Sequence, residues 1–390
     1  MGRPSTAPTT SACRSTNPWS DPMGEFDPVE DLGLAPDKIF VCSARGFLTK
    51  NDPTRDLCER FIRNGGHFYD VLCRYDELTA YVLGREEASA GSVMKWVLPF
   101  LKAHGVTEHA MYEYTKTTLR MMDGAETAIN YIARMMPSYV TTSELQQTTM
   151  PIDDVINTPL CDIFSSVGDL DYANFGRVES RKIREMAAEI SSLKIAKKKY
   201  ELNVSTRIDS DDVTLLKTMD DIIRNRLRET SALNLMESSI PIYAHKKAYR
   251  LLEIRRSTGI DLDGTFYIGS DHTDYQPLFL VKDCNGIAVS YNGSDFAVRG
   301  CNVAVMANDS TIGALLASVF FDKGYQHVID MANNWDRRSL KNMDVVDPYL
   351  RDYVLKRHSR KLPEVVVVDR HNVDAVAEKS EAYRKRILAR

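Results

Sequence analysis

The chain has 390 residues, 43% of them hydrophobic, and a formal net charge of −4. This length and hydrophobic content are enough to bury the core of one large or two ordinary domains. The slightly acidic balance provides no basic field for nucleic acid or for an anionic membrane surface, so the sequence excludes both as expected partners.

Cysteine usage and hydropathy predict a cytoplasmic protein. The seven cysteines form no CxxC, CxC or Cys/His ligand pattern. An odd number without such spacing indicates reduced thiols, and neither a disulfide framework nor a zinc site. No apolar run reaches the roughly 18 residues of a membrane span, and the N-terminus lacks the basic-then-apolar order of a signal peptide. We therefore expect no membrane insertion.

The first elements predict a tail followed by a βα unit. Residues 1–35 are rich in Pro, Ser and Thr, which predicts a flexible tail. Residues 36–66 form the first βα unit: a buried strand at 39–42 runs into a loop at Gly46, and Asp52-Pro53 begins a helix. In an open parallel sheet the loop after such a strand lies at a ligand-binding edge.

Helical periodicity dominates the next part of the chain. Residues 67–135 predict a helical cap, and a strand at 139–143 then begins the remainder of the core, 136–390. A long helical insertion is expected at about 175–233, with helices at 177–202 and 210–233 and a basic run at 194–199 near the end of the first. Cations at a helix C-terminus suit the helix dipole, which favours a solvated face over a nucleic-acid patch.

The C-terminal part predicts strands in quick succession. A helix at 244–254 carries Lys246 and Lys247, and a closing helix starts at Val373. Strands are expected at 265–268, 286–291, 302–306 and 364–368. Together these elements predict an α/β fold with a parallel sheet.

One string matches a catalytic signature in the wrong context. Residues 261–265 read DLDGT, the DxDGT motif of phosphatases that use an aspartate nucleophile. That chemistry places the first aspartate at the end of a buried strand. Here a helix end and Gly259 precede the motif, so we interpret it as a turn between helix and strand.

The order of strand, cap, hydroxyl-bearing strand, lysine-bearing helix and acidic loop resembles the haloacid dehalogenase superfamily of phosphatases. It is most similar to the archaeal group known as energy-converting hydrogenase A subunit R, found in methanogens. The resemblance spans about residues 37–387, and its matching passages are GFLTKND at 46–52, FIRNGGHFYDVLCRYDE at 61–77, WVLPFLKAHGVTE at 96–108, YIGSDHTDYQPL at 267–278, GIAVSYNGSDFAVR at 286–299, VAVMAND at 303–309 and EKSEAYRKRI at 378–387. It implies a haloacid dehalogenase-like Rossmannoid core with a helical cap insertion.

The resemblance also shows where this chain departs from the family. The family loop resembles DCEGPL, so its nucleophile position falls on Ser43 and its second acidic position on Arg45. The metal loop resembles GDSITD, so its first aspartate falls on Ser270 and its last on Asp274, with Asp271 one position away. The positions that hold phosphate in the family are kept, and they fall on Thr142 or Ser143, and on Lys247 with Lys246 as a second candidate.

Charge then argues against metal-dependent chemistry. Mg²⁺ prefers hard oxygen ligands, usually including carboxylates, and Arg45 places a cation where the family has an acid. We expect no cofactor, with Mg²⁺ held by Asp274 and Asp271 only if an activity survives. Arg45 with Lys247, Thr142 and Ser143 instead predicts a pocket for a phosphate-like anion.

Three functions stay open from sequence. The favoured one is a pseudoenzyme: a non-catalytic binding, accessory or assembly component with protein partners, suggested by the resemblance to be an archaeal methane-metabolism or hydrogenase complex. The second is an active magnesium-dependent phosphatase that recruits Asp271, Asp274 and Asp52. The third is a sensor of a phosphorylated small molecule. Arg45 is equally well explained by a structural ion pair with Asp274 or Asp271, and His272 by a surface position rather than by a role as base for Ser43.

Overall fold

The computed structural model describes residues 37–156, 163–198, 200, 207–343 and 347–388. Within these residues a seven-stranded sheet has the order β3-β2-β1-β4-β5-β6-β7. All neighbouring strands are parallel except β6 and β7. The strands are β1 Ile39–Cys42, β2 Ser138–Leu145, β3 Ile163–Ser166, β4 Thr265–Gly269, β5 Ile287–Tyr291, β6 Val303–Met306 and β7 Glu364–Val367. The predicted α/β class is therefore confirmed, whereas the predicted tail at 1–35 lies outside the described residues.

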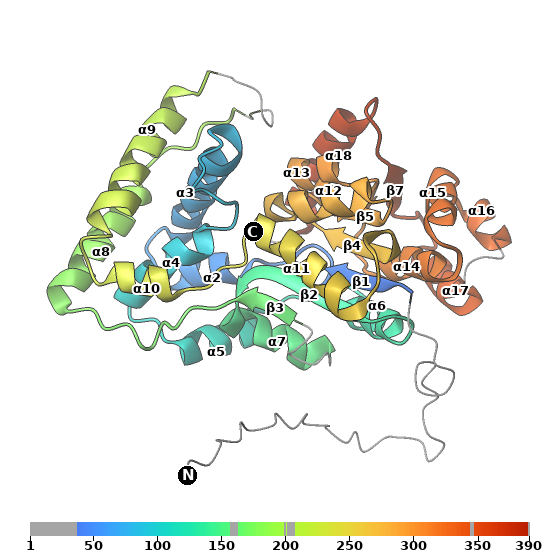
Figure 1. Cartoon of the computed structure of the whole chain (residues 1–390), viewed down its shortest axis with the longest axis horizontal. Coiled ribbons are helices and arrows are strands. Elements are labelled where there is room, and N and C mark those ends of the chain that lie inside the picture. The colour runs from blue at the N-terminus through green and yellow to red at the C-terminus, as the bar shows by residue number, and fades with distance from the viewer. Residues whose placement is uncertain (1–36, 157–162, 199, 201–206, 344–346, 389–390) are drawn as a thin grey trace, which may run out of the picture. The chain divides into compact units, whose positions relative to one another are not determined.

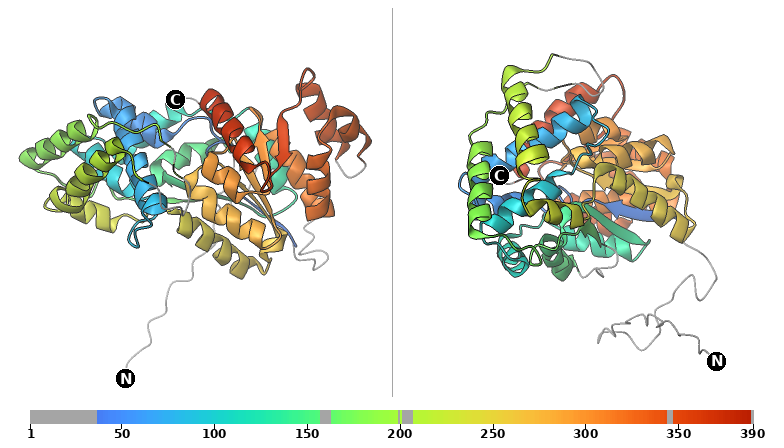
Figure 2. Two further views of the ribbon diagram at one scale, coloured as in Figure 1. Left: turned by 90° about the horizontal axis from the view of Figure 1, so that it is seen from above. Right: turned by 60° about the vertical axis from the view of Figure 1, so that its left-hand side comes forward.

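Alternation along the strands divides the sheet between two cores. Phe40 and Cys42 of β1 point into a core with α6, α14 and α15, whereas Ile39 and Val41 pack with α11, α12, α13 and α18. This follows from the two-residue period of a strand buried on both faces. Figures 1 and 2 show the resulting layers, with helices on each side of the sheet.

The described residues also form many helices, which cover or extend the sheet. Their bounds are α2 Pro53–Phe61, α3 Gly65–Glu77, η1 Leu78–Val82, α4 Val93–Ala103, α5 Glu108–Thr118, α6 Ala125–Ala133, α7 Gln146–Ile156, α8 Arg177–Ile190, α9 Ser210–Asp220, η3 Asp221–Arg226, α10 Ala232–Ser238, α11 Ala244–Thr258, η4 Leu262–Gly264, η5 His272–Asp274, α12 Tyr275–Asp283, α13 Asp295–Gly300, α14 Thr311–Lys323, α15 Tyr325–Asn333, α16 Arg337–Asn342, α17 Pro348–Arg357 and α18 Val373–Ile387. As the sequence predicts, α2 begins at Pro53 and the Asp52 carboxylate caps it by accepting from the Arg55 amide.

A separate helical core lies outside the sheet. It combines apolar side chains of α2, α3 and α4 with those of α8, α9, η3 and α10. The two helical stretches that the sequence suggests are thus one packed unit, although strands β2 and β3 lie between them in the chain. We call this unit the cap. The segment at 125–133, predicted as the end of the cap, instead packs on the sheet as α6, because Ile129 and Ile132 join the sheet's core.

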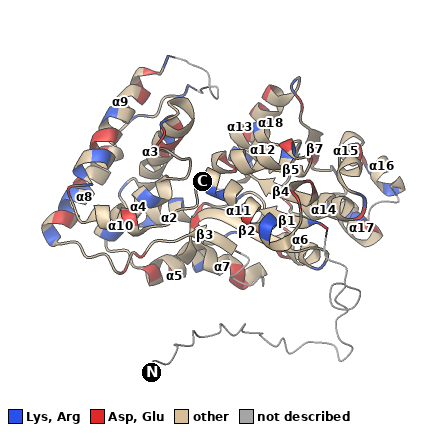
Figure 3. Cartoon of the chain, viewed as in Figure 1, with Lys and Arg blue, Asp and Glu red and all other residues tan. Residues whose placement is uncertain are grey.

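Two predicted helices are wrong in extent. The helix expected at 177–202 ends at Ile190, so the basic run at 194–199 lies beyond it and does not face its dipole. The helix expected at 210–233 is interrupted at 221–226 by a π-helical turn and restarts as α10. Acidic and basic side chains are interspersed along α8 and α9 (Figure 3).

The DLDGT string lies at the amino end of β4. Its aspartates are exposed, and Asp261 pairs with Arg255 at 2.5 Å between the guanidinium Nε and the carboxylate. Residues 262–264 form a short 3-10 turn, as the interpretation as a connecting turn requires. Among the described helices, none is long and apolar enough to cross a membrane.

Candidate functional site

The carboxyl ends of β1, β2 and β4 bring three loops together. Cys42 is in register with Val140 of β2 and Ile268 of β4, so Ser43 leaves the sheet beside both neighbouring strands. Gly46 has a φ of +86°, and a Cβ added there would lie 2.2 Å from the Ser270 hydroxyl oxygen. Only glycine therefore allows the β1 and β4 loops to approach this closely.

Asp274 is the centre of this cluster and is fully buried. Both carboxylate oxygens are saturated by donors, two of which come from the adjacent β4 loop as backbone amides. Oδ1 accepts from Ser43 Oγ at 2.5 Å, Lys247 Nζ at 2.8 Å and Tyr267 OH at 3.0 Å, and Oδ2 accepts from the amides of Ser270 at 2.8 Å and Asp271 at 3.1 Å. These five donors leave no lone pair of Asp274 for a metal ion.

Lys247 neutralises Asp274 inside the protein. Its side chain is only 2% exposed, and its ammonium also donates to Ser43 Oγ at 3.0 Å and Thr273 Oγ1 at 2.9 Å. All three protons of the ammonium therefore have acceptors. Lys246 lies elsewhere, with its ammonium 5.2 Å from the centre of the Tyr243 ring. Of the two lysines proposed for anion binding, the structure brings Lys247 to the cluster, and there it already has an internal counter-ion.

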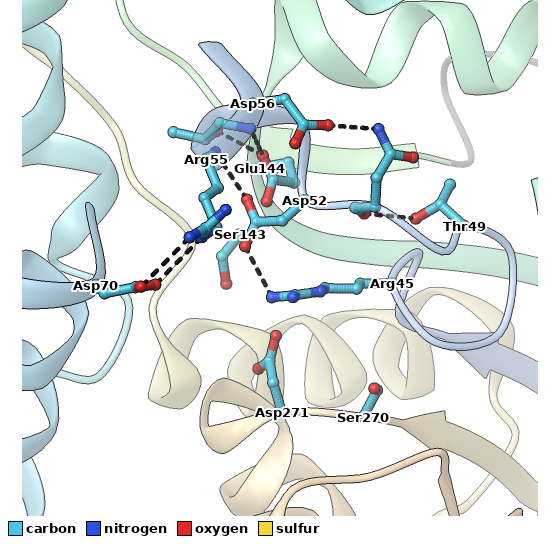
Figure 4. A network of polar contacts seen from close by, with 12 residues as sticks. Arg45, Thr49, Asp52, Arg55, Asp56, Asp70, Ser143, Glu144, Ser270 and Asp271 are labelled. Carbon is cyan, nitrogen blue, oxygen red and sulfur yellow. Dashed lines mark hydrogen bonds and ion pairs between the residues drawn. The ribbon is translucent and has the colours of Figure 1, made fainter. Parts of the chain in front are cut away.

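Arg45 takes a different partner from those considered in the sequence. Its Nη1 lies 2.7 Å from Oδ2 of Asp52, the carboxylate that also caps α2 (Figure 4). Burial lowers the pKa of Arg45, but the charges of Asp52 and Asp271 outweigh it and raise that pKa above its usual value. The expected ion pair with Asp274 is wrong because Lys247 occupies that carboxylate. Arg45 Nε is buried and has no hydrogen-bond partner among the described residues.

Glu144 is a site residue that sequence reasoning missed. It follows Ser143 at the end of β2, and its Oε2 lies 2.5 Å from Thr54 Oγ1 (Figure 4). Burial, followed by the charge of Asp52, raises the pKa of Glu144 to about 8. The carboxyl group is therefore largely neutral at pH 7. A glutamate directly after the predicted hydroxyl-bearing strand was the available signal.

Arg384 is the second residue that the sequence did not single out. It comes from α18, and its Nη1 donates to the Ser270 hydroxyl at 2.5 Å, to the Ser270 carbonyl at 2.8 Å and to the Asn292 carbonyl at 3.0 Å. Burial and then the nearby charge of Arg45 lower the pKa of Arg384 to about 10. A guanidinium thus contacts the position where the resembled family has the first acid of its metal loop. The passage at 378–387 that carries the family resemblance includes Arg384, but the resemblance implied no role for this residue.

The hydroxyls predicted to hold a phosphate are also engaged within the protein. Ser143 Oγ donates to Thr273 Oγ1 at 3.2 Å, and Thr142 Oγ1 accepts from the Glu144 amide at 3.2 Å. Asp271, the weaker metal candidate, accepts from the amide and hydroxyl of Thr273. Burial raises the pKa of Asp271, but Lys247, His272 and Arg384 together hold it well below its ordinary value.

The residues at this site do not fit a Mg²⁺ ion. No group of three or more His, Cys, Asp or Glu residues able to hold a metal occurs in the part of the chain that the structure describes. Ser43 and Ser270 stand at two of the family's acidic positions, and Arg45 and Arg384 bring two positive charges beside them. A divalent cation would meet repulsion here without the carboxylates that usually offset it.

His272 joins the site to the cap and does not serve Ser43. Its Nε2 lies 3.2 Å from Oδ2 of Asp76 in α3, and its backbone carbonyl accepts from the Tyr81 hydroxyl at 2.7 Å. Asp76 is 1% exposed and also accepts from the amides of Gly91 and Ser92. The interpretation of His272 as a surface residue is therefore wrong: it is a partly buried contact between the β4 loop and the cap.

This contact predicts a pH-dependent stability. Burial lowers the pKa of His272, but Asp76, Asp271 and Glu77 outweigh it and raise that pKa above the unfolded value. A group whose pKa is higher in the folded than in the unfolded state contributes its full stabilisation of the fold at pH values below the unfolded pKa. That stabilisation disappears as the pH rises through the folded-state pKa. We therefore expect Tm to fall as the pH rises above the ordinary histidine pKa of about 6.5.

The variant His272→Gln should lose this pH dependence while keeping the size of the side chain. The exposed His109→Gln is the matched control and should behave as the parent protein. A pH profile of Tm that is the same in the parent and in His272→Gln would contradict the assignment of the titration to the Asp76–His272 pair.

The arrangement defines a class of protein: an α/β protein with a mostly parallel sheet, a helical cap, and a polar cluster at the carboxyl edge beneath it. Comparison with solved structures supports this fold. A gene product of Archaeoglobus fulgidus matches with a TM-score of 0.72 at 19% identity, over 90% of this chain and 96% of that one. This likeness shows the fold alone.

Two phosphoserine phosphatase structures also match, more weakly. One is a phospho-aspartyl intermediate analogue, with a TM-score of 0.41 at 10% identity, and the other an apo form, with 0.40 at 11%; each match covers 70% of this chain and 95% of the other. TM-scores this low carry no argument about this chain. No protein-family model and no curated protein sequence matches it.

Proposed function

We propose that this protein is a haloacid dehalogenase-like pseudoenzyme, whose phosphotransfer centre is closed by internal ion pairs and which acts as a binding or assembly component. The observation that carries the proposal is the saturation of Asp274 by Lys247, Ser43, Tyr267 and two backbone amides. Asp274 is the acid that this chain retains from the resembled metal loop. With its oxygens occupied, Asp274 offers no lone pair to a metal ion or to a substrate proton.

The burial of Ser43 also supports a protein without phosphatase activity. Ser43 is only 4% exposed, and its hydroxyl already donates to Asp274 and accepts from Lys247. A serine becomes a nucleophile when a neighbouring base takes its proton and an open face receives the substrate. Lys247 is a charged donor here and cannot be that base, and burial closes the face.

The biological setting is proposed from the resemblance alone. The passages shared with the archaeal energy-converting hydrogenase A subunit R group favour a cytoplasmic component of a hydrogenase or methane-metabolism complex. Affinity purification from an archaeal host that encodes the chain tests this, with subunits of such a complex expected in stoichiometric amounts. Recovery of the protein alone, at native expression level and low salt, would count against it.

A phosphatase assay tests the loss of activity. We expect purified protein with p-nitrophenyl phosphate and Mg²⁺ to show no turnover beyond that of the Asp274→Asn variant, because neither the nucleophile nor the metal ligands are present. The assay measures p-nitrophenolate release across pH 5 to about 9. Turnover that depends on Mg²⁺ and disappears in Asp274→Asn would establish the phosphatase alternative instead.

The structure also predicts what restoring the family's acids would require. Ser43→Asp, Arg45→Glu and Ser270→Asp together should still bind Mg²⁺ poorly, because Arg384 already donates to Ser270 and would pair with the new carboxylate. Adding Arg384→Met should release that carboxylate, and the four-fold variant should show a Mg²⁺-dependent rise in Tm. Equal Mg²⁺ responses with and without Arg384→Met would contradict this role of Arg384.

A second candidate function, an anion sensor, is favoured by one observation. Arg45 Nε is buried without a partner among the described residues, and Arg384 places a second guanidinium nearby. Such a donor suits a phosphate-like anion. Inorganic phosphate and phosphorylated metabolites should then raise Tm in the parent protein and not in Arg45→Met, with the exposed Arg60→Met as control. No Tm rise in the parent leaves the assembly role as the sole proposal.

A further inference from the structure

The cap contains a cavity that the candidate site does not use. Its volume is about 440 Å³, within the range typical of small-ligand pockets. It is bounded by α3, η1, α4, η3 and α10, and by the residue that precedes α11. The lining residues used in the argument are Tyr75, Arg85, Lys95, Trp96, Arg228 and Tyr243.

Positive charge predominates around this cavity. Four cations line it, and three of them have acidic partners: Arg85 pairs with Asp220 through two bonds of 2.6 and 2.8 Å, Arg224 pairs with Glu87, and Arg228 lies 3.5 Å from Glu237. The fourth is Lys95 of α4, whose ammonium makes no hydrogen bond or ion pair within the described residues. The charge of Glu237 still acts on Lys95, but Glu237 also pairs with Arg228, so these two cations share one acid beside the cavity.

Aromatic rings provide a second type of surface in the same space. Tyr75 and Trp96 pack with ring centroids 5.0 Å apart and planes at 51°, and Tyr243 lines the cavity from the start of α11. Indole and phenol rings offer flat faces on which another ring can stack. Trp96 is next to Lys95 in the chain, so a stacking face and this ammonium come from the same turn of α4.

We propose that this cavity binds a small organic anion that carries a flat ring, of the chemical class of nucleotides, with Lys95 and Arg228 contacting the anionic group and the rings of Trp96 and Tyr243 contacting the base. Four cations face three acidic partners, Glu87, Asp220 and Glu237, and this excess of positive charge favours a phosphate-bearing ligand over a neutral one. The volume accommodates a ring and a sugar. This site is independent of the proposed function, because no residue of the Asp274 cluster lines it.

One chain of contacts nevertheless connects the cavity to the candidate site. Ser92 lines the cavity, and its amide donates to Asp76 at 3.0 Å, the carboxylate that holds His272 of the β4 loop. A ligand that displaces Ser92 would therefore act on the contact between cap and loop.

Isothermal titration of the full chain with ADP, GDP and UDP tests the proposal. Adenosine and pyrophosphate serve as probes for the ring and for the anionic group alone. We expect at least one nucleotide to bind, and adenosine and pyrophosphate to bind roughly tenfold or more weakly, because each makes only one of the two types of contact. The absence of binding by all three nucleotides, or pyrophosphate binding as tight as theirs, would overturn the proposal.

Variants distinguish this site from the Asp274 cluster. Lys95→Met keeps the aliphatic stem and should weaken nucleotide binding roughly tenfold, as should Trp96→Leu. Lys102→Met makes the same charge change on the same helix outside the cavity and should leave the affinity unchanged. Equal weakening in Lys102→Met and Lys95→Met would mean a general charge effect and overturn the site. Thermal melts of each variant verify that the cap is folded.

Discussion

Replacing Lys247 with methionine is expected to lower the free energy of unfolding by ~3–5 kcal/mol, the usual cost of removing one partner from a buried ion pair. The pair is well hidden, because the Lys247 side chain is 2% exposed and that of Asp274 0%. Methionine preserves the volume of the lysine stem but leaves the Asp274 carboxylate without its counter-ion. Urea denaturation followed by circular dichroism measures the change.

Two further variants make this prediction specific. Lys246→Met changes the neighbouring residue, whose ammonium lies over the Tyr243 ring, and should cost less than about 1 kcal/mol. Combining Lys247→Met with Asp274→Leu removes both charges and should recover part of the loss, since hydrophobic replacement of a buried pair is often close to neutral. A loss below about 1 kcal/mol in Lys247→Met alone would show that the pair is not essential to the folded site.

The second large effect is expected in the cap, where Asp212→Ala should cost up to ~3–5 kcal/mol because Arg74 would lose its fully buried partner and keep only the more exposed Glu77 as an ion-pair partner. Asp212 of α9 is 0% exposed and lies 2.7 Å from Nη2 of Arg74 in α3. It also accepts from the Tyr200 hydroxyl at 2.8 Å. The contact joins the two stretches of chain that form the cap.

Hydrogen exchange measured by mass spectrometry locates this effect. Peptides from α3, α8 and α9 should exchange faster in Asp212→Ala, while peptides from β1 and β4 should keep their protection, because the cap and the sheet have separate hydrophobic cores. Asp211→Ala, an exposed aspartate in the same turn, is the matched control. Uniform loss of protection across the chain would show that cap and sheet unfold together.

Local patterns in the sequence predicted six of the seven strands in the described residues, and β3 was not expected. Ile39–Cys42 and Thr265–Gly269 are short apolar runs bounded by turn residues, and each forms a buried strand of the parallel sheet. The start of α2 at Pro53 was equally readable, because Asp52 caps the helix from the adjacent position. The DLDGT string was correctly set aside, since the residues before it are helical.

Helix ends in the cap were less predictable. The amphipathic pattern of α8 continues into charged residues that do not form helix, and the π-helical turn at 221–226 leaves no mark in the spacing of apolar residues. The packing of α6 against the sheet, and not in the cap, could not be predicted for a similar reason. An apolar stripe specifies that a helix is buried on one side, but not which partner buries it.

The sequence by itself determined that the chain is an α/β protein, because this follows from local patterns, and the resemblance predicted Ser43, Arg45 and Ser270 at positions where the resembled family has acids. Only the tertiary structure decided which partner each buried charge contacts: Asp274 pairs with Lys247, Arg45 pairs with Asp52, and Arg384 donates to the neutral oxygens of Ser270, 114 residues away. A buried charge takes the partner that the fold brings within hydrogen-bond distance, and neither spacing nor composition specifies that distance.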